Sequence, residues 1–187
     1  MPASSLLRTF VACATPCPPD LARLLKELGG LGSAVKASAP RGLHCTLKFL
    51  GDTAPETAAQ LGPSLAAAVS DVSPFSVELV GIGAFPDAQR PNVIWAGLQA
   101  DPLITLFERI EAVATGFGYR PEQRPFHPHV TLARVKHRPP PRLAELMQEH
   151  AGTKWGKFEV NGVELFKSTP TPSGSRYDVL ATAPLRR

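Results

Sequence analysis

The sequence predicts an α+β fold with antiparallel strand pairing, and three observations support this. Short segments in which apolar and polar residues alternate recur along the chain, as expected of half-buried strands. They are separated by segments with apolar residues at helical spacing. A His-x-Thr-Leu pattern occurs twice, beginning at His44 and at His129. We interpret this recurrence as an internal repeat, and expect two similar lobes that face each other across a groove, with one histidine from each.

The first strands are expected at 5–12 and 43–50, where apolar and polar residues alternate. Between them, Pro19 begins a helix with leucines at helical spacing, and Gly29 ends it. The polar residues of the second strand should share one face: His44, Thr46 and Lys48.

Two further helices carry start signals. Thr53 and Glu56 have the spacing of a capping box and open an alanine-rich helix toward residue 69, which Pro63 is expected to kink or split. Asp101 caps the next helix, with Pro102 at its first position.

The remaining elements are expected as strands at 76–83, 92–98, 129–135, 158–167 and 177–183, with a helix at 142–150. In the strand at 129–135, His129, Thr131 and Ala133 should face one way, so the pattern of the first His-x-Thr element returns.

Composition limits the class of protein. With 187 residues and 43% apolar content, the chain can bury a core, and we take 1–187 as a single two-lobed domain. The net charge of +4 weakly favours polyanionic partners. Six basic residues around the second histidine element could form a phosphate-attracting rim: Arg120, Arg124, Arg134, Lys136, Arg138 and Arg142.

The cysteine pattern and the apolar runs bear on location. Three cysteines without the spacing of a disulfide framework or a zinc knuckle indicate a reducing, cytoplasmic setting. No apolar stretch reaches membrane-spanning length, so no membrane partner is expected. Because one chain contains both histidine elements, we expect a monomer.

Each His-x-Thr element would present an imidazole and a hydroxyl on one strand face. The hydroxyl can donate to a phosphate oxygen, while a histidine, whose ordinary pKa is about 6.5, can exchange a proton with a bridging oxygen or water. Hydrolysis of a cyclic phosphodiester needs a base and an acid on opposite sides of phosphorus. Two opposed histidines meet both needs, which predicts hydrolysis without metal or cofactor and a bell-shaped pH profile near neutrality.

Two segments resemble the paired signatures of the bacterial and archaeal RNA 2′,3′-cyclic phosphodiesterases, two-histidine phosphoesterases also described as 2′-5′ RNA ligases. They are LHCTLKFLG at 43–51 and RPFHPHVTLAR at 124–134. The similarity extends to Arg8–Ala12, to Gly83–Pro86 before Trp95, and to Gly174 with Tyr177.

The resemblance implies a bilobal fold with pseudo-twofold symmetry, in which two antiparallel sheets flanked by helices face each other across a central cleft. It also implies hydrolysis of an RNA terminal 2′,3′-cyclic phosphate, or of a small cyclic nucleotide, to a 2′-phosphate, with 2′-5′ RNA ligation as the reverse reaction. His44 would then be the acid that protonates the departing 3′ oxygen and His129 the base that activates water, while Thr46 and Thr131 hold phosphate oxygens. The residues alone do not orient the acid and the base.

Further residues have two interpretations each. Arg134 follows the second motif, where a guanidinium could bind phosphate bidentately or be a solvated strand-end charge. Phe126 could stack on a nucleobase or anchor the proline-rich loop in the core. His127 is expected to be a structural neighbour of the site, because Pro128 interrupts the strand there. Lys48 could touch RNA phosphate, although a solvent-facing lysine is the default.

Two alternatives come from other classes. A zinc site could use His127 and His129 with His44 or His137, but no carboxylate or cysteine completes a familiar ligand spacing. A noncatalytic RNA-end binding protein would also hold a phosphate, but such a protein has no need for two proton-transfer groups.

Overall fold

The computed structural model describes residues 5–172 and 174–186, and within them the chain forms four α-helices and nine strands. The helices are α1 (Pro19–Gly29), α2 (Pro55–Ala68), α3 (Pro102–Gly116) and α4 (Pro141–Glu149). The strands are β1 (Leu7–Ala14), β2 (Val35–Ala37), β3 (His44–Thr53), β4 (Phe75–Phe85), β5 (Val93–Gln99), β6 (His129–Val135), β7 (Lys154–Val160), β8 (Gly162–Thr171) and β9 (Gly174–Pro184). The α+β class is therefore as predicted.

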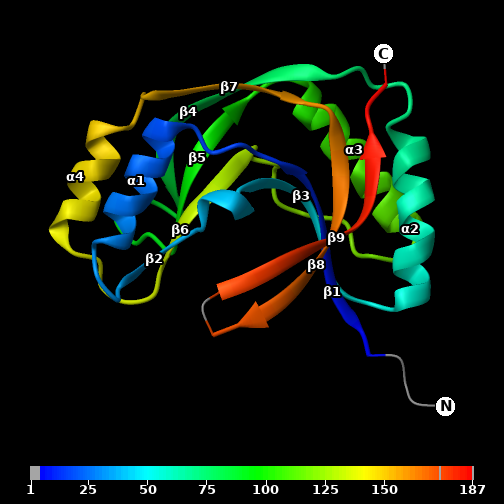
Figure 1. Ribbon diagram of the computed structural model, residues 1–187, viewed down its shortest axis with the longest axis horizontal. Coiled ribbons are helices and arrows are strands. Elements are labelled where there is room, and N and C mark those ends of the chain that lie inside the picture. Colours follow the sequence, from blue (N-terminus) through cyan, green and yellow to red (C-terminus); the bar gives the residue numbers. More distant parts are fainter. Residues whose placement is uncertain (1–4, 173, 187) are drawn as a thin grey trace.

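All these strands belong to one strongly curled antiparallel sheet with the order β7-β4-β5-β6-β3-β1-β8-β9, to which β2 is added beside β6 (Figure 1). The expectation of two separate sheets facing each other was wrong. The two motif strands, β3 and β6, pair with each other through Cys45 and Val130. Because this pairing joins the two groups of strands, their backbone hydrogen bonds continue from one edge to the other.

The chain crosses between the two ends of the sheet at Asn161. β7 pairs with β4 at one end, whereas β8 pairs with β1 near the other. The single strand expected at 158–167 is thus two strands that belong to opposite ends of the sheet. Two local signals mark the break in the sequence: the dipeptide Asn161-Gly162, and a shift of the apolar positions from Phe158 and Val160 to Val163 and Leu165.

The helices pack on one face of the sheet, with α1 and α4 over one half and α2 and α3 over the other (Figure 1). The leucines expected to face the core from α1 are all buried: Leu21, Leu24, Leu25 and Leu28. The other face carries none of the four α-helices of the described residues; a short 3-10 helix, Pro40–Gly42, leads into β3. We call this face of the sheet the open face, defined by His44, Thr46, His129 and Thr131.

The predicted capping box of α2 was wrong. α2 begins at Pro55 without a side-chain cap, because β3 continues to Thr53. The Thr53 side chain is buried, and its hydroxyl hydrogen-bonds with the hydroxyls of Thr9, at 2.7 Å, and Tyr119, at 2.8 Å. The helix also continues through Pro63 without the expected split. Asp101 occupies the N-cap of α3, but its side chain makes no capping bond.

β3 carries a β-bulge directly after its motif. Ala12 of β1 pairs with Thr46, but Val11 pairs with Lys48, so Leu47 is the extra residue. A bulge inverts the alternation of side chains that follows it. Leu47 and Lys48 are therefore both buried, and Phe49 is exposed instead. The prediction that Lys48 shares the face of His44 was wrong for this reason.

β6 carries a bulge at the equivalent position. Trp95 of β5 pairs with Thr131, but Ile94 pairs with Ala133, so Leu132 is the extra residue. Ala133 is fully buried, against the expectation that it faces the same way as Thr131. The next residue, Arg134, is exposed. Phe49 and Arg134 thus occupy equivalent positions after the two motifs.

Candidate active site

The pairing of β3 with β6 brings the two His-x-Thr motifs together. Cys45 and Val130 are cross-strand partners with buried side chains, so the residues on either side of them point to the open face. In an antiparallel pair this register sets Thr131 opposite His44, and His129 opposite Thr46. The two histidines are then diagonal neighbours, with Cα atoms about 7–8 Å apart. The two motifs are therefore neighbours on the open face of the sheet.

His44 is held in one orientation by its own backbone. Its Nδ1 donates to the carbonyl oxygen of Gly42 at 2.7 Å. Because a carbonyl only accepts, this bond assigns the proton to Nδ1 and leaves Nε2 for a ligand. The ring packs against Phe10, with centroids 4.9 Å apart, and against Tyr177, at 5.1 Å.

His129 has the same arrangement. Its Nδ1 donates to the carbonyl oxygen of His127 at 2.6 Å, again two residues earlier in the chain. Its ring packs against Phe85, with centroids 5.0 Å apart, and lies 6.3 Å from Trp95. Both motifs therefore present an Nε2 of fixed tautomer between aromatic side chains.

Burial lowers the pKa of both histidines. For His44, loss of hydration is the main cause, the bond to Gly42 opposes it, and the nearby charge of His129 lowers the pKa further. For His129, loss of hydration is again the main cause, with the His127 carbonyl opposing it. The neutral form is thus favoured in both rings when no anion is bound.

The motif threonines are partly buried on the open face. Among the described residues, neither the Thr46 nor the Thr131 hydroxyl has a hydrogen-bond partner. The Ser38 hydroxyl donates to the backbone carbonyl oxygen of Thr131, at 2.8 Å, and not to its side chain. Each hydroxyl can therefore donate to a phosphate oxygen without first breaking a bond within the protein.

Arg134 lies beside a second cation. It is the cross-strand partner of Lys36 in β2, and both residues are exposed. Neither side chain makes an ion pair within residues 5–172 and 174–186. Two adjacent unpaired cations attract an anion, which favours the phosphate-binding interpretation of Arg134.

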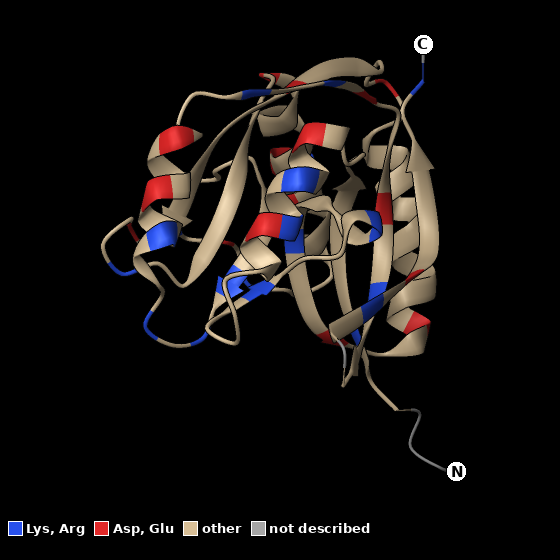
Figure 2. Cartoon of the chain, turned by 60° about the vertical axis from the view of Figure 1, so that its left-hand side comes forward, with Lys and Arg blue, Asp and Glu red and all other residues tan. Residues whose placement is uncertain are grey.

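Two of the other basic residues expected at the rim form ion pairs with carboxylates. Arg124 is paired with Glu122, and Arg142 with Glu149 on α4, which lies outside the sheet. The Arg120 carbonyl accepts a bond from Lys48 at 2.7 Å. Figure 2 accordingly shows lysines and arginines distributed over helices, loops and strands rather than in one band. Proximity in sequence overstated their proximity in space, because the chain leaves β6 for α4.

Two phenylalanines near the motifs differ in their packing and exposure. Phe126 stacks on Phe107 of α3, with centroids 4.4 Å apart and planes within 3°, and packs against the main core. This packing confirms the core-anchor interpretation, and Phe107 occupies one face of the Phe126 ring. Phe49 was missed, although it is 68% exposed and its ring lies 6.2 Å from that of Phe10. Aligning the two motifs would have found it, because it matches Arg134.

His127 lies next to the site, as expected. Its ring is 4.6 Å from that of Trp95 and 6.2 Å from that of His129, while its carbonyl orients His129. Cys45 is buried in the core, and burial raises the pKa of its thiol to about 12, as expected for a residue without a nucleophilic role. Within the described part of the chain, no three His, Cys, Asp or Glu side chains are grouped so that they could hold a metal ion.

Comparison with known proteins agrees with this geometry. The family model of the 2′-5′ RNA ligase superfamily matches residues 17–171. The chain belongs to this superfamily. It is 37% identical over 163 residues to a protein of Aeropyrum pernix named RNA 2′,3′-cyclic phosphodiesterase, covering 86% of this chain and 92% of that protein.

Solved structures of similar proteins support the same membership. The protein TT0787 of Thermus thermophilus matches with a TM-score of 0.79 and 27% identity, over 96% of this chain and 98% of that one. Escherichia coli LigT, complexed with 3′-AMP, matches with a TM-score of 0.70 and 26% identity, over 97% and 99%. As for membranes, no helix in the described residues has the length and apolar character needed to cross one.

Proposed function

We propose that the protein hydrolyses a 2′,3′-cyclic phosphate at the end of RNA to a 2′-phosphate, without a metal ion or other cofactor. The observation that carries the proposal is the twin arrangement of the two motifs, in which each Nδ1 is bonded to a carbonyl and each Nε2 is left for the substrate. Relatives in the superfamily that are named RNA 2′,3′-cyclic phosphodiesterases support the choice of substrate.

In the proposed reaction, the phosphorus lies between the two Nε2 atoms. His129 takes a proton from water as its oxygen bonds to phosphorus, and protonated His44 gives a proton to the 3′ oxygen as the P–O3′ bond breaks. The product is a 2′-phosphate with a free 3′ hydroxyl. Exchange of protons with solvent returns both rings to their starting states. The opposite assignment of acid and base would release the 2′ oxygen and give a 3′-phosphate.

The hydroxyls of Thr46 and Thr131 donate hydrogen bonds to the non-bridging phosphate oxygens, and Arg134 supplies positive charge from the end of β6. The lowered pKa of His44 and His129 has a consequence here. A bound phosphate anion favours the protonated imidazole, so substrate binding itself promotes the single protonation that the reaction needs.

The terminal base stacks on Phe49 in this proposal, in place of Phe126. An exposed phenylalanine on the open face accepts any base, which predicts little preference for the terminal nucleotide. When an RNA 5′ hydroxyl occupies the position of the attacking water, the same site would join RNA through a 2′-5′ linkage as the P–O3′ bond breaks.

The two halves of the sheet are related in this proposal by an approximate twofold axis between Cys45 and Val130. In the order β7-β4-β5-β6-β3-β1-β8-β9, four strands lie on each side of this axis, β2 being an additional strand beside β6, and the equivalent bulges support the relation. Since both motifs come from one chain, a monomer suffices for activity. The three unpaired cysteines support a cytoplasmic location.

The test is to incubate EDTA-treated protein with an oligoribonucleotide that ends in a 2′,3′-cyclic phosphate, and to identify the product by mass spectrometry and phosphatase sensitivity. A 2′-phosphate is expected, and His44→Ala and His129→Ala should each lower kcat by about 10²–10⁴ while retaining RNA binding. A 3′-phosphate would reverse the acid and base, whereas binding without turnover would favour an RNA-end binding protein.

A further inference from the structure

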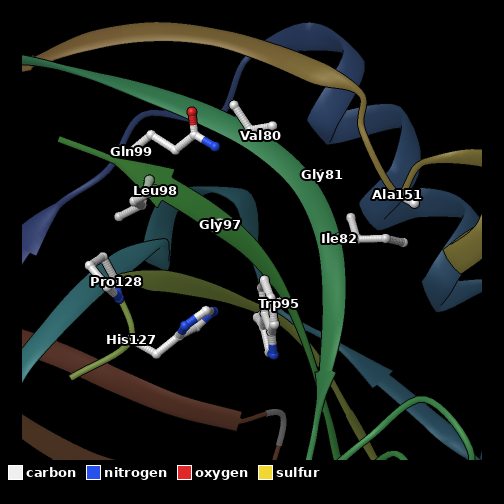
Figure 3. A pocket seen from close by; sticks show the side chains of 10 residues that line it. All are labelled: Val80, Gly81, Ile82, Trp95, Gly97, Leu98, Gln99, His127, Pro128 and Ala151. Atoms are coloured by element: carbon white, nitrogen blue, oxygen red, sulfur yellow. The ribbon is translucent and has the colours of Figure 1, made fainter. Parts of the chain in front are cut away.

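A hollow on the open face extends away from the His129 motif, over β4 and β5. It has a volume of about 300 Å³, near the lower end of the range for small-ligand sites. Figure 3 shows the side chains around it. Those that matter here are Trp95, Gly97 and Gln99 of β5, Val80 of β4, and His127 with Pro128.

One of the residues that line the hollow is a glycine, Gly97. Trp95, Gly97 and Gln99 alternate with buried residues along β5, so all three lie on the open face. A Cβ built on Gly97 would come within 2.9 Å of the Val80 carbonyl oxygen and lie 3.7 Å from the Trp95 ring. Among the described residues, no side chain covers the backbone of β5 between Trp95 and Gln99.

Trp95 forms a fixed wall of the hollow. Its indole lies directly over Gly83 of β4, where a Cβ would come within 2.3 Å of the ring. Phe85 and His127 contact the indole from the sides, with centroids at 5.3 Å and 4.6 Å. Glycine at position 83 thus lets the ring rest against the neighbouring strand.

The hollow is continuous with the two motifs. Gly97 is the cross-strand partner of His129, and Trp95 is the partner of Thr131. Side chains of such partners are neighbours, with Cβ atoms about 4.5–5.5 Å apart. The hollow therefore begins beside His129, on the side of β6 away from β3, while Phe49 lies on the β3 side.

The lining suits a nucleobase rather than a phosphate. No lysine, arginine, aspartate or glutamate is among the described residues that line it. Trp95, His127 and Val80 offer aromatic and aliphatic surfaces to the faces of a base, and the Gln99 amide can hydrogen-bond with its edge.

We propose that the hollow over Gly97 binds the base of the penultimate nucleotide, which is the one before the nucleotide that carries the cyclic phosphate. This inference rests on the proposed function, which places the terminal base on Phe49 at the other side of the motifs. Its consequence is selection of RNA ends over cyclic mononucleotides, because a mononucleotide has no second base to fill the hollow.

The test compares kcat/KM for a dinucleotide that ends in a 2′,3′-cyclic phosphate with kcat/KM for the cyclic mononucleotide of the same terminal base. Wild-type protein is expected to prefer the dinucleotide by about tenfold or more, the effect of one base–aromatic contact. Val80→Phe should fill the hollow, because Val80 is the cross-strand partner of Gly97. It should remove this preference and leave the mononucleotide value within about twofold.

Ile104→Phe adds the same kind of side chain at an exposed position of α3 and should change neither value. Gln99→Ala, at an exposed position, should lower the dinucleotide value alone and provides a second variant if Val80→Phe does not fold. Equal losses on both substrates would assign the hollow to the terminal base and overturn the proposal. An unchanged preference in folded Val80→Phe would also overturn it.

Failure of the proposed function would look different, because wild-type protein would then hydrolyse neither substrate. Calorimetric titration with a dinucleotide that ends in a 2′-phosphate, and with the matching mononucleoside 2′-phosphate, still tests the hollow in that case. Tighter binding of the dinucleotide that disappears in Val80→Phe supports the hollow, and equal binding of the two probes by wild-type protein overturns it.

Discussion

Replacing Lys48 by methionine should strongly destabilise the protein, because the bulge in β3 places this lysine in the core. Its side chain is 6% exposed and that of Glu111 is 14% exposed, with Nζ 2.6 Å from Glu111 Oε1. The two charged groups form an ion pair, but their geometry is not that of a hydrogen bond. The Lys48 Nζ instead donates a hydrogen bond to the Arg120 carbonyl oxygen at 2.7 Å. Methionine would leave a buried carboxylate unpaired, which costs about 3–5 kcal/mol.

For a chain of this length, 1 kcal/mol changes Tm by about 2–4 °C, so Lys48→Met should lower Tm by about 6–20 °C. Thermal unfolding followed by circular dichroism would measure this for the wild type, Lys48→Met, Glu111→Leu and the double variant. The double variant should regain most of the loss, because an apolar pair can replace a buried ion pair at little cost. A decrease below about 2 °C in Lys48→Met, or a double variant no more stable than this single one, would refute the reasoning.

Three further predictions concern the site. Burial lowers the pKa of both His44 and His129, so the singly protonated pair forms in the free enzyme only below the ordinary value of 6.5. The maximum of kcat/KM should therefore lie below that pH. A maximum above pH 7 would contradict this. The unfolded chain binds protons at these two histidines more readily than the folded protein does. The pair should therefore leave the free energy of unfolding unchanged above pH 6.5 and lower it as the pH decreases below 6.5. In urea titrations, a variant with both histidines replaced by glutamine should show a smaller decrease. Phe126→Ala should lower the free energy of unfolding by about 3–5 kcal/mol without raising KM, because Phe126 stacks on Phe107. Phe49→Ala should raise KM for the RNA end about tenfold and leave Tm nearly unchanged, because Phe49 is exposed. The opposite pattern would return base stacking to Phe126.

The residues of the proposed chemistry could be selected from the sequence because they form short local patterns. A strand places residues two apart on one face, so each His-x-Thr element specified its own imidazole and hydroxyl. The α+β class and the helix carrying Leu21, Leu24 and Leu28 followed from alternation and helical spacing, which the structure confirms.

Some outcomes depended on information beyond a few neighbouring residues. Thr53 had the spacing of a helix cap, but its hydroxyl bonds with Thr9 and Tyr119, which are distant in the sequence. Lys48 continued the alternation of its strand, but a bulge redirected it toward Glu111. Phe126 stood beside the motif in sequence, but it packs on α3.

By itself, the sequence determined which residues carry the proposed chemistry and that they occur as two similar motifs. The tertiary structure decided how these motifs meet, through the single pairing of Cys45 with Val130 that joins both halves into one sheet. It also decided which neighbours surround them, since the bulges replace Lys48 by Phe49 on the open face. The physical reason is that strand register and bulges depend on contacts between distant segments, and local alternation does not encode them.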